Sequence, residues 1–421
     1  MKITVANPSV APHVQQTVKA YYEAGYLDLF CTAFFEHPDN KLSSYLKKIA
    51  SIEKEINRRS FHDIPIEKFA SRPLPELLRS LASRKLGAIT TDKIWEWSEL
   101  GFDKWVSSKL NAETDAVHTY EHAALATLTK AKALKKFCIY EQPSVHHIFF
   151  NNLAKQQLAL YPELKSAAMA LKVNHKADRR NSRRDRELEL ADLILCNSSF
   201  TRSTLIQGGI DFAKIIVNPL AFPPVCANGA QQSTTINKPV VFLHAGNQSI
   251  TKASHIVYEA WRNCNFTEAE AELWLIGKMA LPESSRKDLP GKVIIMDNIP
   301  HSDLMALYQQ ANVLIMPTLA DGFGMVITEA MSQGVPVIAS TNCCGPDVIE
   351  HMKDGWIIPA GNIDLLTEQL KWCVSNKQGL PQMGKAALEK ASKWQWPQYK
   401  QKLSAIIFNR WEQFLQLKES V

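Results

Sequence analysis

The sequence predicts an α/β protein made of two parallel-sheet domains that face a cleft. Short continuous apolar runs such as Val313–Met316 recur along the chain, and such runs are typical of strands buried on both faces of a parallel sheet. Predicted helices alternate with these strands, which is the pattern of α/β domains. The length of 421 residues exceeds one ordinary domain and suits two of roughly 200 residues each.

Composition places the chain among water-soluble globular proteins, with 46% hydrophobic and 21% charged residues. No apolar run approaches the roughly 18 residues of a membrane span. Met1 and Lys2 lead directly into an expected strand, so we predict no secretory signal. Eight cysteines are scattered without a CxxC pair, which favours reduced thiols in a cytoplasmic protein.

The net charge of +6 is unevenly distributed, because the positive excess lies in residues 1–219. Its densest part is the stretch Lys172–Arg186. Such a stretch is compatible with a solvated helix face, with an anionic membrane surface, or with an acidic acceptor. Nucleic-acid binding is disfavoured because the stretch lacks the interleaved aromatic residues of a single-strand binder.

The first half begins with a predicted strand at Lys2–Ala6, a loop and a helix from about His13 to Ala24 that Gly25 ends. A second strand is expected over 27–35, and residues 41–110 are expected to be mostly helical. Later segments are expected to form strands at 114–120, 137–140 and 214–219, and a helix followed by a strand over 187–198. The Pro-rich and polar stretch 220–238 is the best linker in the chain.

Polar residues follow two of these strands. Ligands of open parallel sheets sit beyond the carboxyl ends of the strands, so these residues are candidates for the reaction centre or for acceptor contacts. They are Tyr120, Glu121, His122, Glu141, His146 and His147.

The second half predicts strands at 239–246, 273–277, 293–296, 313–316, 337–340 and 356–359. Its most informative stretch is the loop from Asp321 to Met325. Gly322 and Gly324 allow a sharp turn, and a helix beginning near Phe323 to Met325 would present its positive end to an anion such as a phosphate.

Two carboxylates frame this loop: Asp321 before the glycines and Glu329 about two turns into the helix. Carboxylates are good acceptors for sugar and ribose hydroxyls, so the arrangement suggests a ligand with hydroxyls at both ends and phosphate between them. The alternative is structural: Asp321 caps the helix and Glu329 is a solvated helix residue.

The spacing from Asp321 to Glu329 resembles the carboxylate-x7-carboxylate signature of glycosyltransferase family 4, in which Glu is commoner at the first position. The resemblance implies two Rossmann-like domains in the GT-B arrangement, and retaining sugar transfer from a nucleotide diphosphate sugar. It implies an acceptor-side domain at 1–219, a linker at 220–238 and a donor-binding domain at 239–399. A closing helix at about 400–421 would pack back on the first domain.

The resemblance also implies site residues. Asp321 would orient the donor sugar and Glu329 would hold the ribose, while Gly246, Asn247 and Lys252 would lie along the diphosphate. Asn247 stands where the family usually has Arg, and Arg262 is a possible substitute. Glu141 stands where a catalytic-side His is common, with His146 and His147 shortly after it. The remaining expected donor contacts are Ile299, His301, Gly322, Phe323, Gly324 and Met325.

No Asp-x-Asp motif follows a strand, so we expect neither a metal ion nor a resident cofactor. The expected partners are a nucleotide sugar and a saccharide or lipid-linked glycan. The protein would meet them in the cytoplasm or at the inner face of the membrane. Two alternatives stay open: a non-catalytic binding or scaffold subunit with this fold, and another GT-B enzyme such as a sugar-nucleotide epimerase or a sugar phosphorylase.

Overall fold

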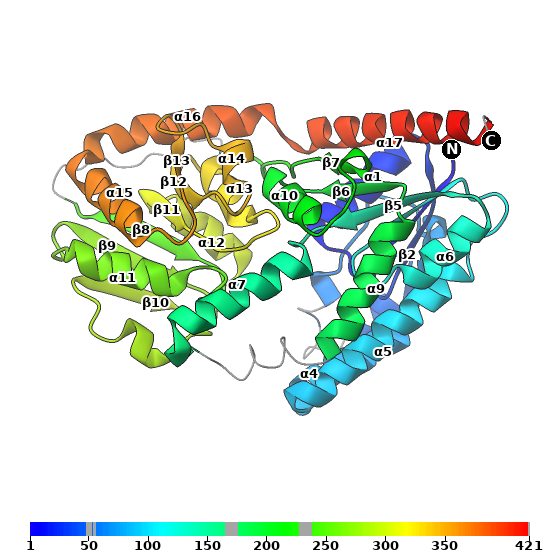
Figure 1. Ribbon diagram of the computed structural model, residues 1–421, viewed down its shortest axis with the longest axis horizontal. Coiled ribbons are helices and arrows are strands. Elements are labelled where there is room, and N and C mark those ends of the chain that lie inside the picture. Colours follow the sequence, from blue (N-terminus) through cyan, green and yellow to red (C-terminus); the bar gives the residue numbers. More distant parts are fainter. Residues whose placement is uncertain (48–52, 54–55, 165–175, 227–237, 420–421) are drawn as a thin grey trace.

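The computed structural model describes residues 1–47, 53, 56–164, 176–226 and 238–419. Each half of the chain forms one parallel sheet with helices packed around it, and the two halves lie side by side (Figure 1). The predicted fold class is confirmed. Part of the predicted linker, residues 227–237, lies outside the described residues.

The first sheet has the strand order β3-β2-β1-β4-β5-β6-β7, with every neighbouring pair parallel. Its central strands are buried on both faces, as their continuous apolar runs predicted. The strands are β1 (Ile3–Ala6), β2 (Leu27–Thr32), β3 (Phe69–Ser71), β4 (Ala116–Tyr120), β5 (Phe137–Gln142), β6 (Leu193–Cys196) and β7 (Ile215–Val217).

The sequence analysis missed β3, which lies in the region expected to be mostly helical. It is an edge strand of three half-exposed residues, too short to produce a recognisable apolar run. The helices around this sheet are α1 (Pro12–Glu23), α2 (Lys41–Lys47), α4 (Pro73–Lys85), α5 (Ala88–Ser107), α6 (Leu125–Ala133), α7 (His147–Leu160), α9 (Lys176–Leu190) and α10 (Ser199–Gln207).

The second sheet has the order β10-β9-β8-β11-β12-β13, again parallel throughout. Its strands are β8 (Val240–Ala245), β9 (Ala271–Ile276), β10 (Lys292–Met296), β11 (Val313–Met316), β12 (Val337–Ser340) and β13 (Gly355–Ile358). Its helices are α11 (Ser254–Cys264), α12 (His301–Tyr308), α13 (Met325–Ser332), α14 (Gly345–Val348), α15 (Ile363–Ser375) and α16 (Leu380–Lys393).

The chain returns from the second domain to the first through helix α17 (Trp396–Glu419), which runs on from α16 along one side of the molecule (Figure 1). The helix packs on α1, where Ser404 Oγ donates to the carbonyl oxygen of Ala20 at 3.3 Å and Lys400 forms an ion pair with Glu23. The last segment of the sequence therefore contacts the first.

Helix α7 also connects the two domains, but it runs from the first toward the second (Figure 1). Leu153 in the middle of the helix and Leu158 near its end pack against the apolar core around α11. Gln157 Oε1 also lies 3.2 Å from His255 Nε2 across the interface. These contacts fix how the carboxyl ends of the two sheets face each other.

Candidate functional site

The loop between β11 and α13 turns as its glycines predicted. Gly324 has a φ of +91°, in the left-handed region that glycine adopts without strain. The Phe323 N–H turns back toward Asp321 Oδ1 at 3.3 Å. Because α13 begins at Met325, its first amides lie at the positive end of the helix. Glu329 is therefore about one turn into the helix, not two as predicted.

Asp321 and Lys252 come together from two different loops. The Asp321 carboxylate forms an ion pair with the Lys252 ammonium, and both side chains are only partly exposed. Asn247 is exposed beside Gly246 and brings no charge to the loop. Arg262 does not substitute for it, because its guanidinium donates to the carbonyl oxygens of Ser285 and Lys287.

Glu329 is 6% exposed and holds two polar partners. Its Oε1 lies 3.1 Å from His301 Nε2, and its Oε2 accepts from the Tyr308 hydroxyl at 3.2 Å. The hydrogen bond to Glu329 raises the pKa of His301, and burial raises the pKa of Tyr308 well above its usual value. Ile299 is half-buried and packs against the apolar core that contains Tyr308. Sequence reasoning missed Tyr308, which no motif marks.

The Gly322 loop presses directly on the first domain. Ser198 Oγ and Thr201 Oγ1 both donate to the Gly322 carbonyl oxygen, at 2.6 and 3.0 Å. A Cβ on Gly322 would lie 1.8 Å from the carbonyl oxygen of Pro143, so no larger residue fits this approach. Ser198 also caps helix α10, where its side chain accepts from the Thr201 N–H, and its contact across the interface carries no mark in the sequence.

Glu141 lies inside the first domain with 2% of its surface exposed. Its Oε2 lies 3.2 Å from His118 Nε2, and His118 Nδ1 lies 2.7 Å from the Tyr21 hydroxyl. The other carboxylate oxygen, Oε1, has no hydrogen-bond partner among the described residues. His118 was not among the sequence candidates, because it precedes the strand end where ligands were expected.

The other first-domain candidates surround the segment before α7. Glu121 accepts from Ser144 Oγ at 2.5 Å and pairs with Arg184 at 3.2 Å, and the Arg184 guanidinium also contacts the His122 ring. The Tyr120 ring is buried and stacks on that of His118. His146 and His147 lie together at the start of α7 and meet Asp185 of α9.

The arginines of the basic stretch are largely engaged within the first domain. Arg180 pairs with Asp92 and Glu96, and its guanidinium lies over the Trp95 ring. Arg183 donates to the carbonyl oxygen of His122, and Arg186 pairs with Glu189 on the same helix. The side chains of Arg180 and Arg183 are 17% and 11% exposed, so these two residues do not form a solvated face. Residues 172–175 lie outside the described residues.

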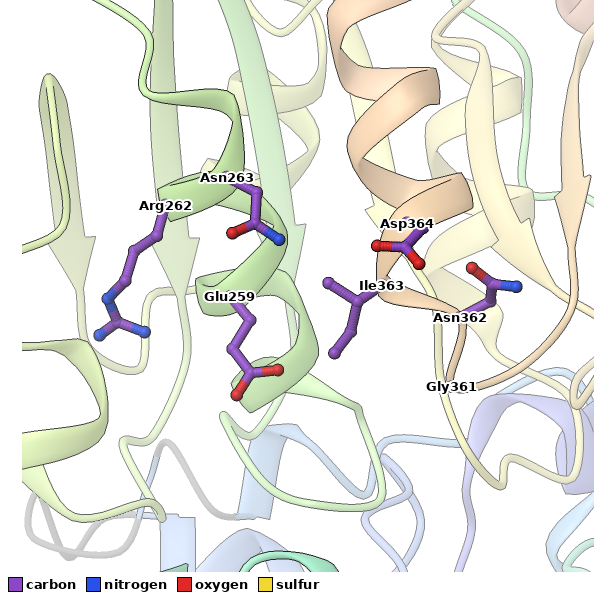
Figure 2. A pocket seen from close by; sticks show the side chains of 7 residues that line it. All are labelled: Glu259, Arg262, Asn263, Gly361, Asn362, Ile363 and Asp364. Carbon is purple, nitrogen blue, oxygen red and sulfur yellow. The ribbon is translucent and has the colours of Figure 1, made fainter.

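A polar recess of about 630 Å³ lies on the second domain between α11 and the start of α15 (Figure 2). Glu259, Arg262 and Asn263 line one side, and Asn362, Ile363 and Asp364 line the other. Of the residues that the sequence analysis named for the site, Arg262 alone is among those that line this recess. The candidate site is therefore identified by its polar contacts and not by this hollow.

All eight cysteines carry free thiols, and six of them are buried, in keeping with the prediction of reduced core fillers. Among the helices that the structure describes, none combines the length and apolar character that crossing a lipid bilayer requires.

Comparison with known protein families agrees with this geometry. Residues 229–390 match the family model described as "Glycosyl transferases group 1". The chain is 26% identical over 220 residues to the sulfoquinovosyl transferase SQD2 of Arabidopsis thaliana, covering 49% of this chain and 42% of that protein. It is 24% identical over 189 residues to the amylovoran biosynthesis glycosyltransferase AmsK of Erwinia amylovora, covering 42% and 46%. The match thus spans less than half of either relative.

Solved structures share the fold along nearly the whole chain. HepE of Anabaena in complex with UDP superposes with a TM-score of 0.58 at 16% identity, over 97% of this chain and 100% of that one. The sucrose-phosphate synthase of Thermosynechococcus elongatus gives 0.60 at 17% identity, with 100% of both chains covered. These structures confirm the fold, and the match of residues 229–390 to the family model confirms the family resemblance drawn from Asp321 and Glu329.

Proposed function

We propose that this chain, whose second domain belongs to the group 1 glycosyltransferase family, is a retaining glycosyltransferase that uses a nucleotide diphosphate sugar. The observation that carries the proposal is that Lys252, from the loop between β8 and α11, lies against Asp321, which shortly precedes the positive end of α13. A cation and the amides at the start of a helix suit a diphosphate, and a carboxylate beside them suits sugar hydroxyls.

In the proposed reaction the bond between the anomeric carbon and the diphosphate oxygen breaks, and an acceptor hydroxyl oxygen forms the new bond on the same face. The acceptor proton passes to the departing diphosphate. Lys252 and the amides of Gly322 to Met325 stabilise the charge on that diphosphate, without a metal ion in the donor site. Asp321 orients the donor sugar, and Glu329 holds the ribose.

The first domain supplies the acceptor side of the proposed site. Glu141 Oε1 is a buried acceptor without a partner among the described residues, and it lies at the carboxyl end of β5. We assign it to a ligand hydroxyl, with His118 fixing the carboxylate through its other oxygen. The acceptor proposed is a saccharide or a lipid-linked glycan in polysaccharide or glycoconjugate synthesis, in the cytoplasm.

The first experiment is a thermal-shift screen of the full chain against UDP, GDP, ADP, TDP and CMP and their sugars, with and without EDTA. UDP and UDP-glucose come first because a structural neighbour is described with both. A rise in melting temperature that one nucleoside diphosphate causes and EDTA leaves unchanged is expected, followed by transfer with that donor. If no nucleotide raises the melting temperature, the proposal fails.

One specific observation favours a second candidate function, a binding or scaffold subunit. Asn247 carries no charge, and Asp321 already neutralises Lys252, so the donor loop offers less positive charge than a diphosphate would find in an Arg and Lys pair. A scaffold would bind the nucleotide yet release none from the sugar donor. An epimerase would instead convert the sugar nucleotide without an acceptor, which product analysis distinguishes.

A further inference from the structure

Two histidines and one carboxylate lie together at the junction of α7 and α9. Asp185 Oδ1 lies 2.6 Å from His147 Nε2 and 3.7 Å from His146 Nε2. All three candidate ligand atoms lie within 4.8 Å of one another. They come from the first residues of one helix and the middle of another, so the backbone holds them in place.

His146 supplies the observation that points to a ligand. Its side chain is 2% exposed, and its Nε2 has no hydrogen-bond partner among the described residues. Leaving a buried polar atom unpaired costs about 1–3 kcal/mol, so such atoms call for an explanation.

The surroundings hold the His146 ring in position. The backbone N–H of His146 donates to Thr204 Oγ1 at 3.0 Å. The imidazole ring lies against Gly208, where an added Cβ would come within 2.5 Å of the ring. Its Nδ1 accepts from the Ile148 N–H at 3.3 Å, a long hydrogen bond. A cation on Nε2 requires the ring proton to sit on Nδ1, so binding would sacrifice that one weak bond.

From this geometry we propose that His146, His147 and Asp185 form a binding site for a divalent transition-metal ion such as Zn²⁺. Imidazole nitrogens and a carboxylate oxygen are ligands that zinc accepts at about 2.0–2.2 Å. Tetrahedral coordination places such ligand atoms about 3.3 Å apart, between the 2.6 and 3.7 Å seen around Asp185. Asp185 is 45% exposed, which leaves the fourth position to water.

This metal site is distinct from the loop from Asp321 to Met325, where the proposed function needs no metal ion. It lies just after Pro143, the residue whose carbonyl meets Gly322, so a bound ion would fasten the start of α7 to α9 beside the domain interface. The remaining alternative is a plain His147–Asp185 hydrogen bond without metal.

Titration of the full chain with Co²⁺ tests the proposal without any nucleotide, so its failure and the failure of the proposed function are distinguishable. The protein is stripped with a chelator and dialysed, and visible absorption follows Co²⁺ binding. We expect one equivalent to bind, Zn²⁺ to displace it, and Zn²⁺ to raise the melting temperature of the stripped protein.

Variants locate the binding. His147→Gln and Asp185→Asn should each weaken Co²⁺ binding at least about tenfold. The matched control is His62→Gln, which removes a ring 2.5 Å from Glu36 in another part of the same domain and should leave binding unchanged. No saturable binding by the folded wild type, or equal affinity in Asp185→Asn, overturns the proposal. If His147→Gln does not fold, Asp185→Asn decides, because its side chain is half-exposed.

Discussion

The two domains carry their candidate residues in opposite ways. In the second domain, Asp321 and Lys252 sit on loops with part of each side chain exposed. In the first domain, Glu141 and His146 are 2% exposed and are held by other residues of the same domain. The polar side chains of the second domain are thus partly accessible to a ligand, whereas those of the first domain are buried and fixed by their neighbours.

The difference shows where local sequence is sufficient to mark a site. A glycine-rich turn and a helix start form within ten residues, so their chemistry is legible in a motif. In the first domain, hydrogen bonds connect Tyr21, His118 and Glu141, which lie up to 120 positions apart in the sequence. No motif can mark such a group.

The largest effect is expected from a substitution of Asp321, which should impair catalysis without weakening nucleotide binding. Asp321→Asn should lower the rate of sugar transfer at least about 100-fold, the usual cost of losing a group that acts in the transition state. Nucleoside diphosphate affinity should hold or increase, because Lys252 is released from its ion pair. Steady-state kinetics and calorimetry measure the two quantities.

The control for this variant is Asp303→Asn, which changes an exposed carboxylate in the first turn of α12. If Asp321→Asn transfers sugar as fast as that control, Asp321 serves only as the partner of Lys252 and of the Phe323 amide.

The next effect concerns Glu329. Glu329→Gln should weaken nucleotide binding about 10- to 100-fold, since a hydrogen bond to a charged group contributes about 1.5–3 kcal/mol. Tyr308→Phe removes only the hydroxyl that donates to Glu329 and should weaken binding less. Calorimetric titration of both variants provides the test. Unchanged affinity in Glu329→Gln would refute the ribose role.

The contact between the domains is tested by Gly322→Ala. The added methyl group would meet the Pro143 carbonyl, so one of the two loops must move, at a cost of about 1–3 kcal/mol. We expect a lower thermal midpoint and slower transfer. Gly379→Ala is the matched control, because nothing lies within 4 Å of a Cβ at that position. Equal melting of the two variants would show that the interface opens freely.

The smallest expected effect is a pH dependence set by His301. Its pKa is raised by Glu329, so the charged pair is fully present below the usual value of 6.5 and is lost as pH rises through the raised pKa. The imidazolium competes with ribose for Glu329, so nucleotide binding should tighten up to about fivefold as this pair is lost, in line with a half-exposed ion pair.

His301→Gln should abolish this side-chain contribution. Nucleotide affinity is measured for the wild type and the variant between pH 6 and pH 8. Protonation of the nucleotide affects both proteins equally, so the difference between the two pH profiles gives the contribution of the histidine. Identical pH profiles would exclude His301 from the proposed donor site.

By itself the sequence determined the two parallel-sheet domains and the turn from Asp321 to Met325. Apolar runs such as Val313–Met316 encode buried parallel strands, and Gly324 encodes a turn that other residues resist. These features depend on neighbouring residues, so local patterns are sufficient to predict them. Short β3 was missed because three half-exposed residues leave no such pattern.

Only the tertiary structure decided which distant groups meet. It placed Ser198 and Thr201 on the Gly322 carbonyl, buried Glu141 against His118, and joined His146 and His147 to Asp185. Hydrogen bonds and ion pairs act over about 3 Å, whereas their partners here are tens of residues apart in the chain. Which of them come within that reach depends on how the sheets and helices pack, and this packing is a property of the whole fold.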